Sequence, residues 1–272
     1  MKNKTKIYKF HFIFDKTKRS RILQKFLKKY KNYSPKKCDV IVVAGGDGFM
    51  LRALKKYYKM KKPFYGINCG TVGFLMNKFE NIALDKKIKK TKIFSINPLE
   101  IKVLNSKGKR FKMLAVNEIS LLRQSRQTTI LDLKINGRNL VEKLVADGVL
   151  VSTPAGSTAY NLSVNGPISS LNSKKLAITP ISPFRPRRWK GKALSDNVKI
   201  SISNADPSKR PVAAVADNHE FRNIKSVSIL SNKKIKFNIL FNSKESLIKK
   251  IKLEQKKSTK LSSLLLQSLS TM

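Results

Sequence analysis

The hydrophobic and polar positions follow two different patterns along the chain. Near the N-terminus, short apolar segments alternate with segments whose apolar residues recur at helical spacing. The apolar segments predict strands at 6–14, 38–44 and 63–68, and the others predict helices at 18–33 and 49–60. This alternation predicts an α/β domain, with a small parallel sheet and helices on its faces.

Beyond Pro98 the pattern changes to strands joined by turns, and helical spacing returns only at 243–255. The strand-like segments are 99–104, 111–123, 128–136, 142–153, 175–181, 197–202 and 226–241. We therefore expect an α/β domain over residues 1–95 and a β-rich domain over 96–257 that includes a C-terminal helix. The Ser/Leu-rich tail at 258–272 has no role that the sequence assigns.

A phosphate-binding turn is one interpretation of residues 41–50, IVVAGGDGFM. Gly45, Gly46 and Gly48 allow positive φ and a close approach of backbone N–H groups, and amides at a helix N-terminus favour phosphate. Asp47 would repel that phosphate unless a cation intervenes or the carboxylate is protonated, so the turn suggests phosphoryl transfer. An ordinary loop with Asp47 capping the next helix explains these residues equally well. The spacing matches neither the dinucleotide fingerprint nor the P-loop.

A second candidate site lies in the β-rich half, at residues 147–163, DGVLVSTPAGSTAYNLS. An Asp-Gly turn and a short strand lead into small and hydroxyl residues that can open a helix and offer N–H and O–H donors. Tyr160 adds an aromatic face that can pack on a base or a ribose. A capped helix start without any ligand explains the same residues equally well.

Asn117 and Glu118 interrupt an apolar stretch. Inside one strand, neighbouring side chains point to opposite faces, so at least one of the two is expected to point inward. A buried polar group needs a partner or a ligand. A harmless polar pair in a strand is the simpler explanation.

The charge of the chain is extreme, with 58 Lys and Arg against 16 Asp and Glu, a formal net charge of +42. Nucleic-acid binding is one explanation. The lysines, however, are spread over the whole sequence and form no confined stripe with interleaved aromatics, which favours a compositional bias. We expect no specific nucleic-acid partner.

Membrane insertion is not expected, because no apolar run approaches the roughly 20 residues that a spanning helix needs. The basic N-terminus has strand-like alternation and lacks the features of a signal peptide. Cys38 and Cys69 adjoin predicted buried strands without metal-ligand partners nearby, so both are expected to be reduced core residues of a cytoplasmic protein.

Taken together, these motifs resemble those of bacterial NAD kinases. GGDG at 45–48 is shared with diacylglycerol kinases, sphingosine kinases and, in similar form, phosphofructokinases. The Asn117-Glu118 pair and the 147–163 segment are more specific to NAD kinases. The resembling segments also include GINCGTVGFL at 66–75, ITPISPFRPR at 178–187 and VADNHEFRNI at 215–224. The similarity runs over about residues 38–250 and does not include the 258–272 tail.

The resemblance implies the fold shared by NAD kinases and diacylglycerol kinases, and a defined reaction. The γ-phosphate of ATP, or a phosphate of inorganic polyphosphate, would pass to the 2′-hydroxyl of the adenosine ribose of NAD. Asp47 would act as the catalytic base, and the amides of Gly45, Gly46 and Gly48 would hold phosphates. Mg²⁺ would be held mainly by phosphates and water, without a dedicated protein metal site.

The resemblance also implies a set of NAD-binding residues and an assembly. Asn117 and Glu118 would contact the adenosine portion. Other predicted NAD-binding residues are Asp47, Gly48, Phe74, Asp147, Ala155, Thr158, Ala159, Tyr160, Asn161, Leu162, Ser163 and Asn218. Family members are homodimers or homotetramers, so the 178–190 segment of a neighbouring subunit is expected to contribute to the site. A lipid kinase and a noncatalytic nucleic-acid-binding protein are the alternative functions.

Overall fold

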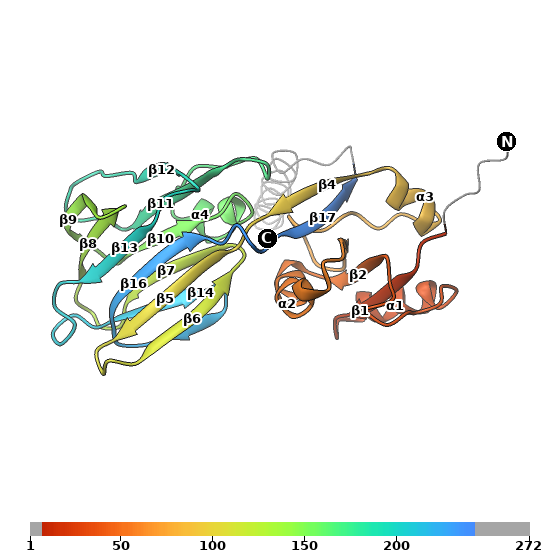
Figure 1. The fold of residues 1–272 in the computed structure, drawn as a ribbon, viewed down its shortest axis with the longest axis horizontal. Helices are drawn as coiled ribbons and strands as arrows, with labels where there is room; N and C mark the ends of the chain where they lie inside the picture. The colour runs from red at the N-terminus through yellow and green to blue at the C-terminus, as the bar shows by residue number, and fades with distance from the viewer. Residues whose placement is uncertain (1–6, 243–272) are drawn as a thin grey trace, which may run out of the picture. The chain divides into compact units, whose positions relative to one another are not determined.

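The computed structural model describes residues 7–242, which form two compact units (Figure 1). Within the described range, unit 1 comprises residues 7–94 and 238–242, and unit 2 comprises residues 95–237. The predicted C-terminal helix at 243–255 and the 258–272 tail lie outside the described residues. None of the helices in residues 7–242 is both long and apolar enough to cross a membrane.

Unit 1 is built on a five-stranded sheet with strand order β1-β2-β3-β17-β4. The strands are β1 (Phe10–Phe14), β2 (Val40–Gly45), β3 (Phe64–Asn68), β4 (Thr91–Ile96) and β17 (Phe237–Asn242). The helices are α1 (Lys18–Leu27), α2 (Asp47–Tyr57), α3 (Leu84–Lys89) and the 3-10 helix η1 (Tyr58–Met60). Strands β1, β2 and β3 run parallel, as the alternating pattern predicts, and β17 also runs parallel to β3.

Helices cover the sheet of unit 1 through their apolar residues. Leu23 and Leu27 of α1 are buried in a core that also holds the inward side chains of β1 and β2. Met50 of α2 packs against Gly66 of β3, where an added Cβ would come within 2.6 Å of the Met50 Cε. Glycine at position 66 therefore lets α2 approach the sheet closely.

Helix α1 ends earlier than its sequence pattern predicts. It begins after Thr17, whose hydroxyl accepts the Ser20 N–H at 3.2 Å, and it ends at Leu27. The following residues pair with β1 instead: the Asn32 carboxamide accepts the Phe12 N–H at 3.0 Å, and the Tyr33 N–H donates to the Phe10 carbonyl at 2.8 Å. These contacts with β1 replace the last turns of the predicted helix.

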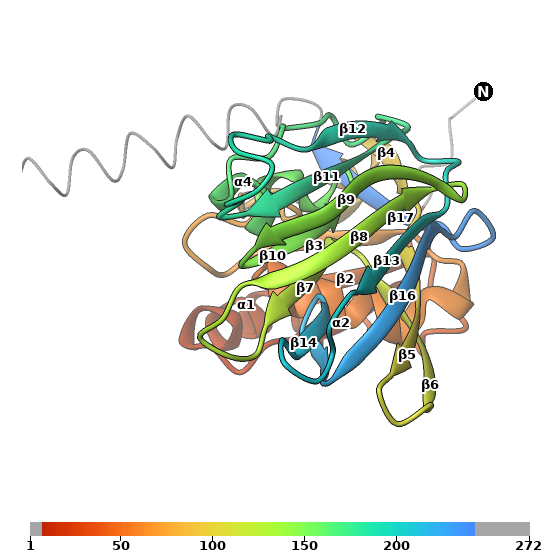
Figure 2. The same cartoon turned by 90° about the vertical axis from the view of Figure 1, so that its left-hand side faces the viewer.

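Unit 2 consists of two six-stranded sheets, in which every recorded strand pairing is antiparallel (Figure 2). The first, in spatial order, contains β12 (Lys192–Ser195), β11 (Lys175–Ile181), β10 (Gly148–Ser152), β7 (Glu118–Arg123), β14 (Val212–Ala216) and β15 (His219–Phe221). The second contains β6 (Arg110–Ala115), β5 (Leu99–Asn105), β16 (Ile224–Ser231), β13 (Ile200–Asn204), β8 (Thr129–Ile135) and β9 (Arg138–Ala146). Two short helices follow β10, namely η2 (Gly156–Thr158) and α4 (Tyr160–Ser163).

One hydrophobic core lies between the two sheets of unit 2. It contains Ile119 and Leu121 of β7, Val149 and Val151 of β10, and Leu131 of β8, all buried. Because strand side chains alternate between faces, the other face of β7 carries Glu118 and Ser120. That face, away from the apolar core, holds the polar candidate residues.

Three predicted strands are wrong in their extent. The segment 142–153 is divided between β9, which ends at Ala146, and β10, which begins at Gly148 in the other sheet. The segment 111–123 is not one strand: β6 ends at Ala115, the chain passes to the other sheet, and β7 begins at Glu118. The segment 226–241 is divided between β16 in unit 2 and β17, which pairs with β3 in the sheet of unit 1. Residues 238–242 therefore belong with the α/β unit and not with the β-rich domain to which 96–257 was assigned.

Candidate active site

In unit 1, the GGDG turn joins the end of β2 to the start of α2. Gly45 is the last residue of β2, Gly46 precedes the helix with extended φ and ψ of −103° and −178°, and Asp47 is the first helical residue. None of the three glycines has positive φ, so that part of the prediction is wrong. At Gly46 and Gly48 an added Cβ would meet no atom within 4 Å, so both positions are open to a ligand.

The Asp47 carboxylate is held in place by the backbone of a second loop. Its Oδ2 accepts the Phe74 N–H at 2.7 Å, and its Oδ1 accepts the Leu75 N–H at 2.8 Å. Two backbone amides thus bond to the two carboxylate oxygens, one to each. The geometry suits a base with a fixed orientation.

Asn68 and Gly73 shape that second loop, and neither was predicted. The Asn68 carboxamide accepts the Gly70 N–H at 2.9 Å and donates to the Val72 carbonyl. Gly73 has φ of +79°, and an added Cβ there would lie 2.7 Å from Asn68 Oδ1, so only glycine fits. The glycines within GINCGTVGFL are the sequence signal that points to this loop.

In unit 2, Asn117 and Glu118 carry buried oxygen atoms without partners. Asn117 lies where the chain passes from β6 to β7, and Glu118 opens β7, so the expectation of two neighbours inside one strand is wrong. Asn117 Oδ1 and Glu118 Oε2 are both buried, and neither has a hydrogen-bond partner among the described residues. An unsatisfied buried polar atom costs about 1–3 kcal/mol, which a ligand with matching donors would offset.

Burial changes the ionisation of Glu118. Loss of solvent, followed by the nearby negative charge of Asp217, raises the pKa of Glu118 from 4.5 to about 8. Glu118 is therefore largely protonated at neutral pH. A protonated carboxyl group can donate one hydrogen bond and accept others, which suits the hydroxyl groups of a ribose.

Asp217, which was not predicted, lies beside the Asn117–Glu118 pair. Its carboxylate accepts the Val116 N–H, at 2.9 Å through Oδ2 and 3.1 Å through Oδ1, and the Asn117 N–H at 2.9 Å. It belongs to VADNHEFRNI, so the sequence pointed to the segment without singling out this residue.

The predicted 147–163 segment packs directly against Asn117. The Thr153 N–H donates to the Asn117 carbonyl at 2.9 Å, and the Thr153 hydroxyl donates to the Val116 carbonyl at 2.7 Å. An added Cβ at Gly156 would lie 2.3 Å from the Asn117 carbonyl oxygen, so the close approach requires glycine. Two predicted motifs that are separate in the sequence are thus in contact.

Tyr160 lies in an acidic environment within unit 2. Burial, then the negative charges of Asp147 and Glu118, raise the pKa of its phenol. Asp147 forms an ion pair with Arg123, with 2.7 Å between Oδ1 and Nε. The Tyr160 side chain is 36% exposed, so its ring remains available to a ligand.

Other predicted residues of this segment differ in accessibility. Ala155, Thr158 and Asn161 are buried, whereas Ser163 and Asn218 are exposed. The Asn161 carboxamide is used inside the protein: it donates to the Pro167 carbonyl at 3.0 Å and accepts the Thr179 hydroxyl at 2.8 Å. The Asn161 side chain thus supports the fold around α4.

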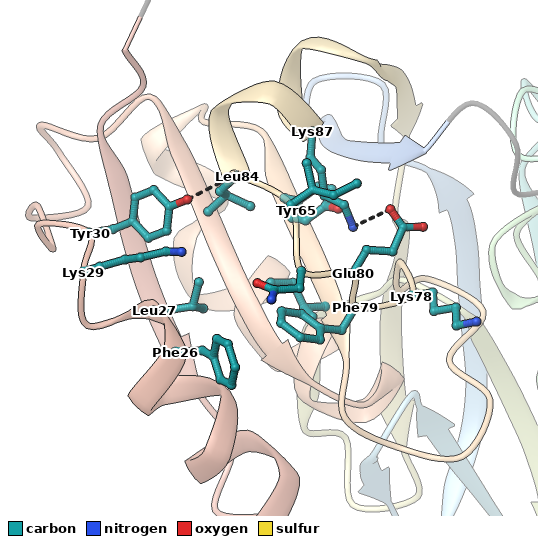
Figure 3. Close-up of a pocket in the computed structure, with 13 residues that line it drawn as sticks. Phe26, Leu27, Lys29, Tyr30, Tyr65, Lys78, Phe79, Glu80, Leu84 and Lys87 are labelled. Carbon is teal, nitrogen blue, oxygen red and sulfur yellow. Dashed lines mark hydrogen bonds and ion pairs between the residues drawn. The ribbon is translucent and has the colours of Figure 1, made fainter.

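None of the predicted site residues lines a cavity that is found in unit 1 (Figure 3). Helix α1 and the 78–87 segment line it, with Lys87 paired to Glu80 at 3.0 Å and the Leu84 N–H donating to the Tyr30 hydroxyl at 2.9 Å. Its volume is about 30 Å³, close to that of one water molecule, so it is too small for a nucleotide. Across residues 7–242, no group of three or more His, Cys, Asp or Glu side chains is arranged to hold a metal ion.

Comparison with known proteins decides the family. The model of the ATP-NAD kinase N-terminal domain matches residues 2–91, and that of the ATP-NAD kinase C-terminal domain matches residues 116–236. An NAD kinase of Hyphomonas neptunium is 43% identical over 234 residues, which are 86% of this chain and 92% of that protein. The chain belongs to the NAD kinase family.

Further NAD kinases support this assignment in sequence and in structure. The NAD kinase of Brucella suis is 43% identical over 246 residues, 90% of this chain and 96% of that protein. An NAD kinase from Archaeoglobus fulgidus, solved in complex with ATP, matches with a TM-score of 0.67 and 25% identity over 87% of this chain and 94% of that one. Yeast NADH kinase complexed with NADH, at 24% identity and a TM-score of 0.67 over 85% of this chain and 75% of that one, has the same fold.

Family membership confirms the expected fold, an α/β unit with a parallel sheet followed by a β-rich unit of the NAD kinase type. It also confirms the expected activity: the protein is an NAD kinase, a phosphotransferase that acts on NAD. Neither a lipid kinase nor a noncatalytic nucleic-acid-binding protein is supported.

Proposed function

We propose that this NAD kinase transfers the γ-phosphate of ATP to the 2′-hydroxyl of the adenosine ribose of NAD, giving NADP. ATP as donor is supported by the Archaeoglobus fulgidus relative, which was solved with ATP. The observation that carries the choice of acceptor is the pair of buried, unpartnered oxygens on Asn117 and Glu118. They require polar partners, which a ribose and a base supply and an acyl chain lacks.

Asp47 is the proposed catalytic base. As the 2′-hydroxyl oxygen attacks the γ-phosphorus, its proton passes to Asp47, and the bond from the γ-phosphorus to the bridging oxygen of ATP breaks, leaving ADP. Support comes from the Phe74 and Leu75 amides, which orient the carboxylate. The open backbone at Gly46 and Gly48, together with Gly45, is proposed to hold donor phosphates.

The remaining predicted residues are proposed to complete NAD binding. Asn117 and Glu118 hold the adenosine portion, and Tyr160 offers its ring to a base or ribose. The other proposed NAD-binding residues are Phe74 in unit 1 and, in unit 2, Asp147, Ala155, Thr158, Ala159, Leu162, Ser163 and Asn218. Asn161 is proposed to act there through its support of α4, because its carboxamide is bonded within the protein.

Magnesium is the proposed metal, brought to the site with ATP. Asp47, an oxygen donor in a phosphate-seeking turn, fits the preference of Mg²⁺ for carboxylate and phosphate oxygens, with phosphates and water supplying most of its ligands. When bound, the ion reduces repulsion between the donor phosphates and the Asp47 carboxylate.

We further propose a cytoplasmic homodimer or homotetramer, in which the 178–190 segment contacts the neighbouring subunit. Within this segment the Phe184 side chain is 51% exposed, and the guanidinium groups of Arg185 and Arg187 each lie 5.5 Å from its ring centroid. Exposed aromatic and arginine side chains together are typical of protein interfaces.

The test is a coupled dehydrogenase assay of NADP formation with purified protein, MgATP and NAD. We expect NADP with ATP, and essentially no phosphorylation of diacylglycerol, sphingosine or fructose 6-phosphate. Polyphosphate in place of ATP determines whether a second donor is accepted. The variant Asn117→Ala should lower kcat/KM for NAD, with a loss of transition-state stabilisation of about 1–3 kcal/mol, because it removes one proposed ligand contact. A better lipid acceptor, or unchanged NAD kinetics in this variant, would refute the proposed NAD site.

A further inference from the structure

We infer that Asp217 is a positioning residue for NAD recognition, whose carboxylate fixes the backbone of Val116 and Asn117 and thereby presents the Asn117 and Glu118 side chains to the substrate. This inference rests on the proposed function of the Asn117–Glu118 pair. Asp217 itself is not proposed to touch NAD or the reacting atoms.

Asp217 holds the backbone segment that connects the two sheets of unit 2. Strand β6 ends at Ala115 and β7 begins at Glu118, so Val116 and Asn117 lie outside both strands. Asp217 accepts both of their N–H groups, and its own N–H donates to the Glu118 carbonyl at 3.1 Å. A carboxylate is a strong acceptor for backbone amides, so these bonds hold the passage more firmly than neutral ones would.

Thr153 holds the same two residues through their other backbone groups. Its N–H and hydroxyl donate to the carbonyls of Asn117 and Val116, at 2.9 and 2.7 Å. The N–H groups are therefore held by Asp217 and the carbonyls by Thr153. With the backbone bonded at both kinds of group, the unpartnered Asn117 Oδ1 and Glu118 Oε2 are left as the oxygens that a ligand can satisfy.

The turn that carries Asp217 also suits this residue type. Asp217 lies between β14 and β15 with φ of +52°, in the left-handed region. Asp and Asn tolerate this region better than most residues, and Gly adopts it without strain. Asp217→Gly therefore removes the carboxylate without straining the backbone, and Asp217→Asn removes the charge while keeping one acceptor oxygen.

The negative charge of Asp217 has a second effect on the pair. Together with burial it raises the pKa of Glu118, so Glu118 remains a hydrogen-bond donor at neutral pH. The other titratable group coupled to Glu118 is Tyr160 of α4, which is itself influenced by the Arg123-paired Asp147. Loss of the Asp217 charge should therefore lower the pH at which Glu118 ionises.

The experiment compares steady-state kinetics of the full chain and of three variants, Asp217→Gly, Asp217→Asn and the control Asp206→Asn. Asp206 is a matched control because it also accepts a backbone amide in unit 2, that of Lys209 at 3.0 Å, and it is outside the proposed site. We expect Asp217→Gly to raise KM for NAD about 10- to 100-fold, with kcat changed less than about threefold and KM for MgATP unchanged. Asp206→Asn should match the wild type.

The pH profile separates positioning from a purely structural role. In the wild type we expect kcat/KM for NAD to fall as pH rises through about 8, where Glu118 ionises. In Asp217→Asn the fall of kcat/KM should move to lower pH. If Asp217→Gly does not fold, the pH profile of Asp217→Asn tests the positioning role of Asp217. Unchanged KM for NAD with an unchanged profile would overturn the inference, as would an equal rise of both KM values with a lowered Tm.

Failure of the inference is distinguishable from failure of the proposed function. If the wild type forms no NADP, or if Asn117→Ala binds NAD normally, the proposed function or its site is wrong. If both of those behave as expected and Asp217→Gly retains the wild-type KM for NAD, only the role of Asp217 is wrong.

Discussion

Asp47, the proposed catalytic base, shows at the scale of one residue how a folded chain orients a side chain. Its two carboxylate oxygens accept amides from residues 27 and 28 positions away in sequence, at 2.7 and 2.8 Å. A carboxylate on an unrestrained side chain would rotate freely, whereas this one has a single orientation. Orientation of a base toward the proton it accepts is part of its catalytic effect.

Replacing Asp47 by Asn should lower kcat by about 10²- to 10⁴-fold, the usual size of a general-base contribution. The fold should persist, because asparagine keeps one acceptor for the backbone amides, and the Kd for NAD should change far less than kcat. Stopped assays of NADP formation and NAD titration on the same preparation measure both quantities. A variant with near-wild-type turnover would show that Asp47 is not the base.

The titration of Glu118 makes the free energy of unfolding depend on pH, and its raised pKa gives the direction. Between pH 4.5 and about 8 the unfolded state loses the Glu118 proton while the folded state keeps it. The folded state then binds more protons, so the contribution of Glu118 to stability is fully present below pH 4.5 and is lost as pH rises toward and through about 8.

Glu118→Gln removes this titration while keeping shape and hydrogen-bonding capacity. Relative to the wild type, the Tm of the variant should therefore rise between pH 5 and pH 8.5, endpoints chosen at roughly the limits of this window. Thermal unfolding of both proteins across that range is the measurement, and the common effect of the +42 charge cancels in the comparison. A Tm difference that is constant with pH would mean that Glu118 is already ionised in the folded protein at low pH.

At the scale of elements, strand β17 shows where sequence patterns fail. Its alternation predicts a strand correctly, but the partner is β3 of unit 1 and not a strand of the β-rich unit. Buried Asn77 holds this pairing: its Nδ2 donates to the carbonyls of Gly66 and Leu240, at 3.1 and 2.9 Å, and its Oδ1 accepts the Asn242 N–H at 2.9 Å.

Replacing Asn77 by Ala should lower the free energy of unfolding by about 2–5 kcal/mol, because several buried backbone groups lose their partner at once. Amide hydrogen exchange in residues 237–242 should also become faster. Urea denaturation and hydrogen exchange measure the two effects, with Asn81→Ala, an exposed asparagine in the same unit, as the control. Equal stability of the two variants would show that Asn77 does not fix β17.

The passage between β6 and β7 is the second element that differs from its sequence pattern. Residues 111–123 alternate well enough to predict one strand, yet the chain changes sheets at Val116 and Asn117. The alternation of apolar and polar residues indicates which face of a strand is buried, but it does not indicate which sheet the strand joins. The break places the candidate pair between the end of β6 and the start of β7, and Asn117 Oδ1 and Glu118 Oε2 have no partner there among the described residues.

For the whole molecule, the charge of +42 predicts weak and unspecific attraction to polyanions. Binding to RNA or DNA should be independent of sequence and should weaken steeply between about 50 and 200 mM salt, as counterion release requires. Fluorescence anisotropy with two unrelated oligonucleotides across a salt series measures this. Sequence-selective, submicromolar binding at physiological salt would reveal a dedicated nucleic-acid surface.

The sequence by itself determined the features that depend on neighbouring residues. The alternation of apolar segments gave the α/β and β-rich character of the two parts, and the GGDG, Asn117-Glu118 and 147–163 motifs pointed to NAD kinases. Such features are visible because helices and strands have fixed periods and because glycines mark turns and close approaches.

Only the tertiary structure decided which groups are desolvated and which are paired. Asp217 bonds to Asn117 across 100 residues of sequence, and Leu240 bonds to Asn77 across 163. The raised pKa of Glu118 and the unpartnered oxygens of the candidate pair arise from burial, which is a property of the packed chain. Burial and long-range pairing depend on every element that packs against a residue, and no local pattern contains that information.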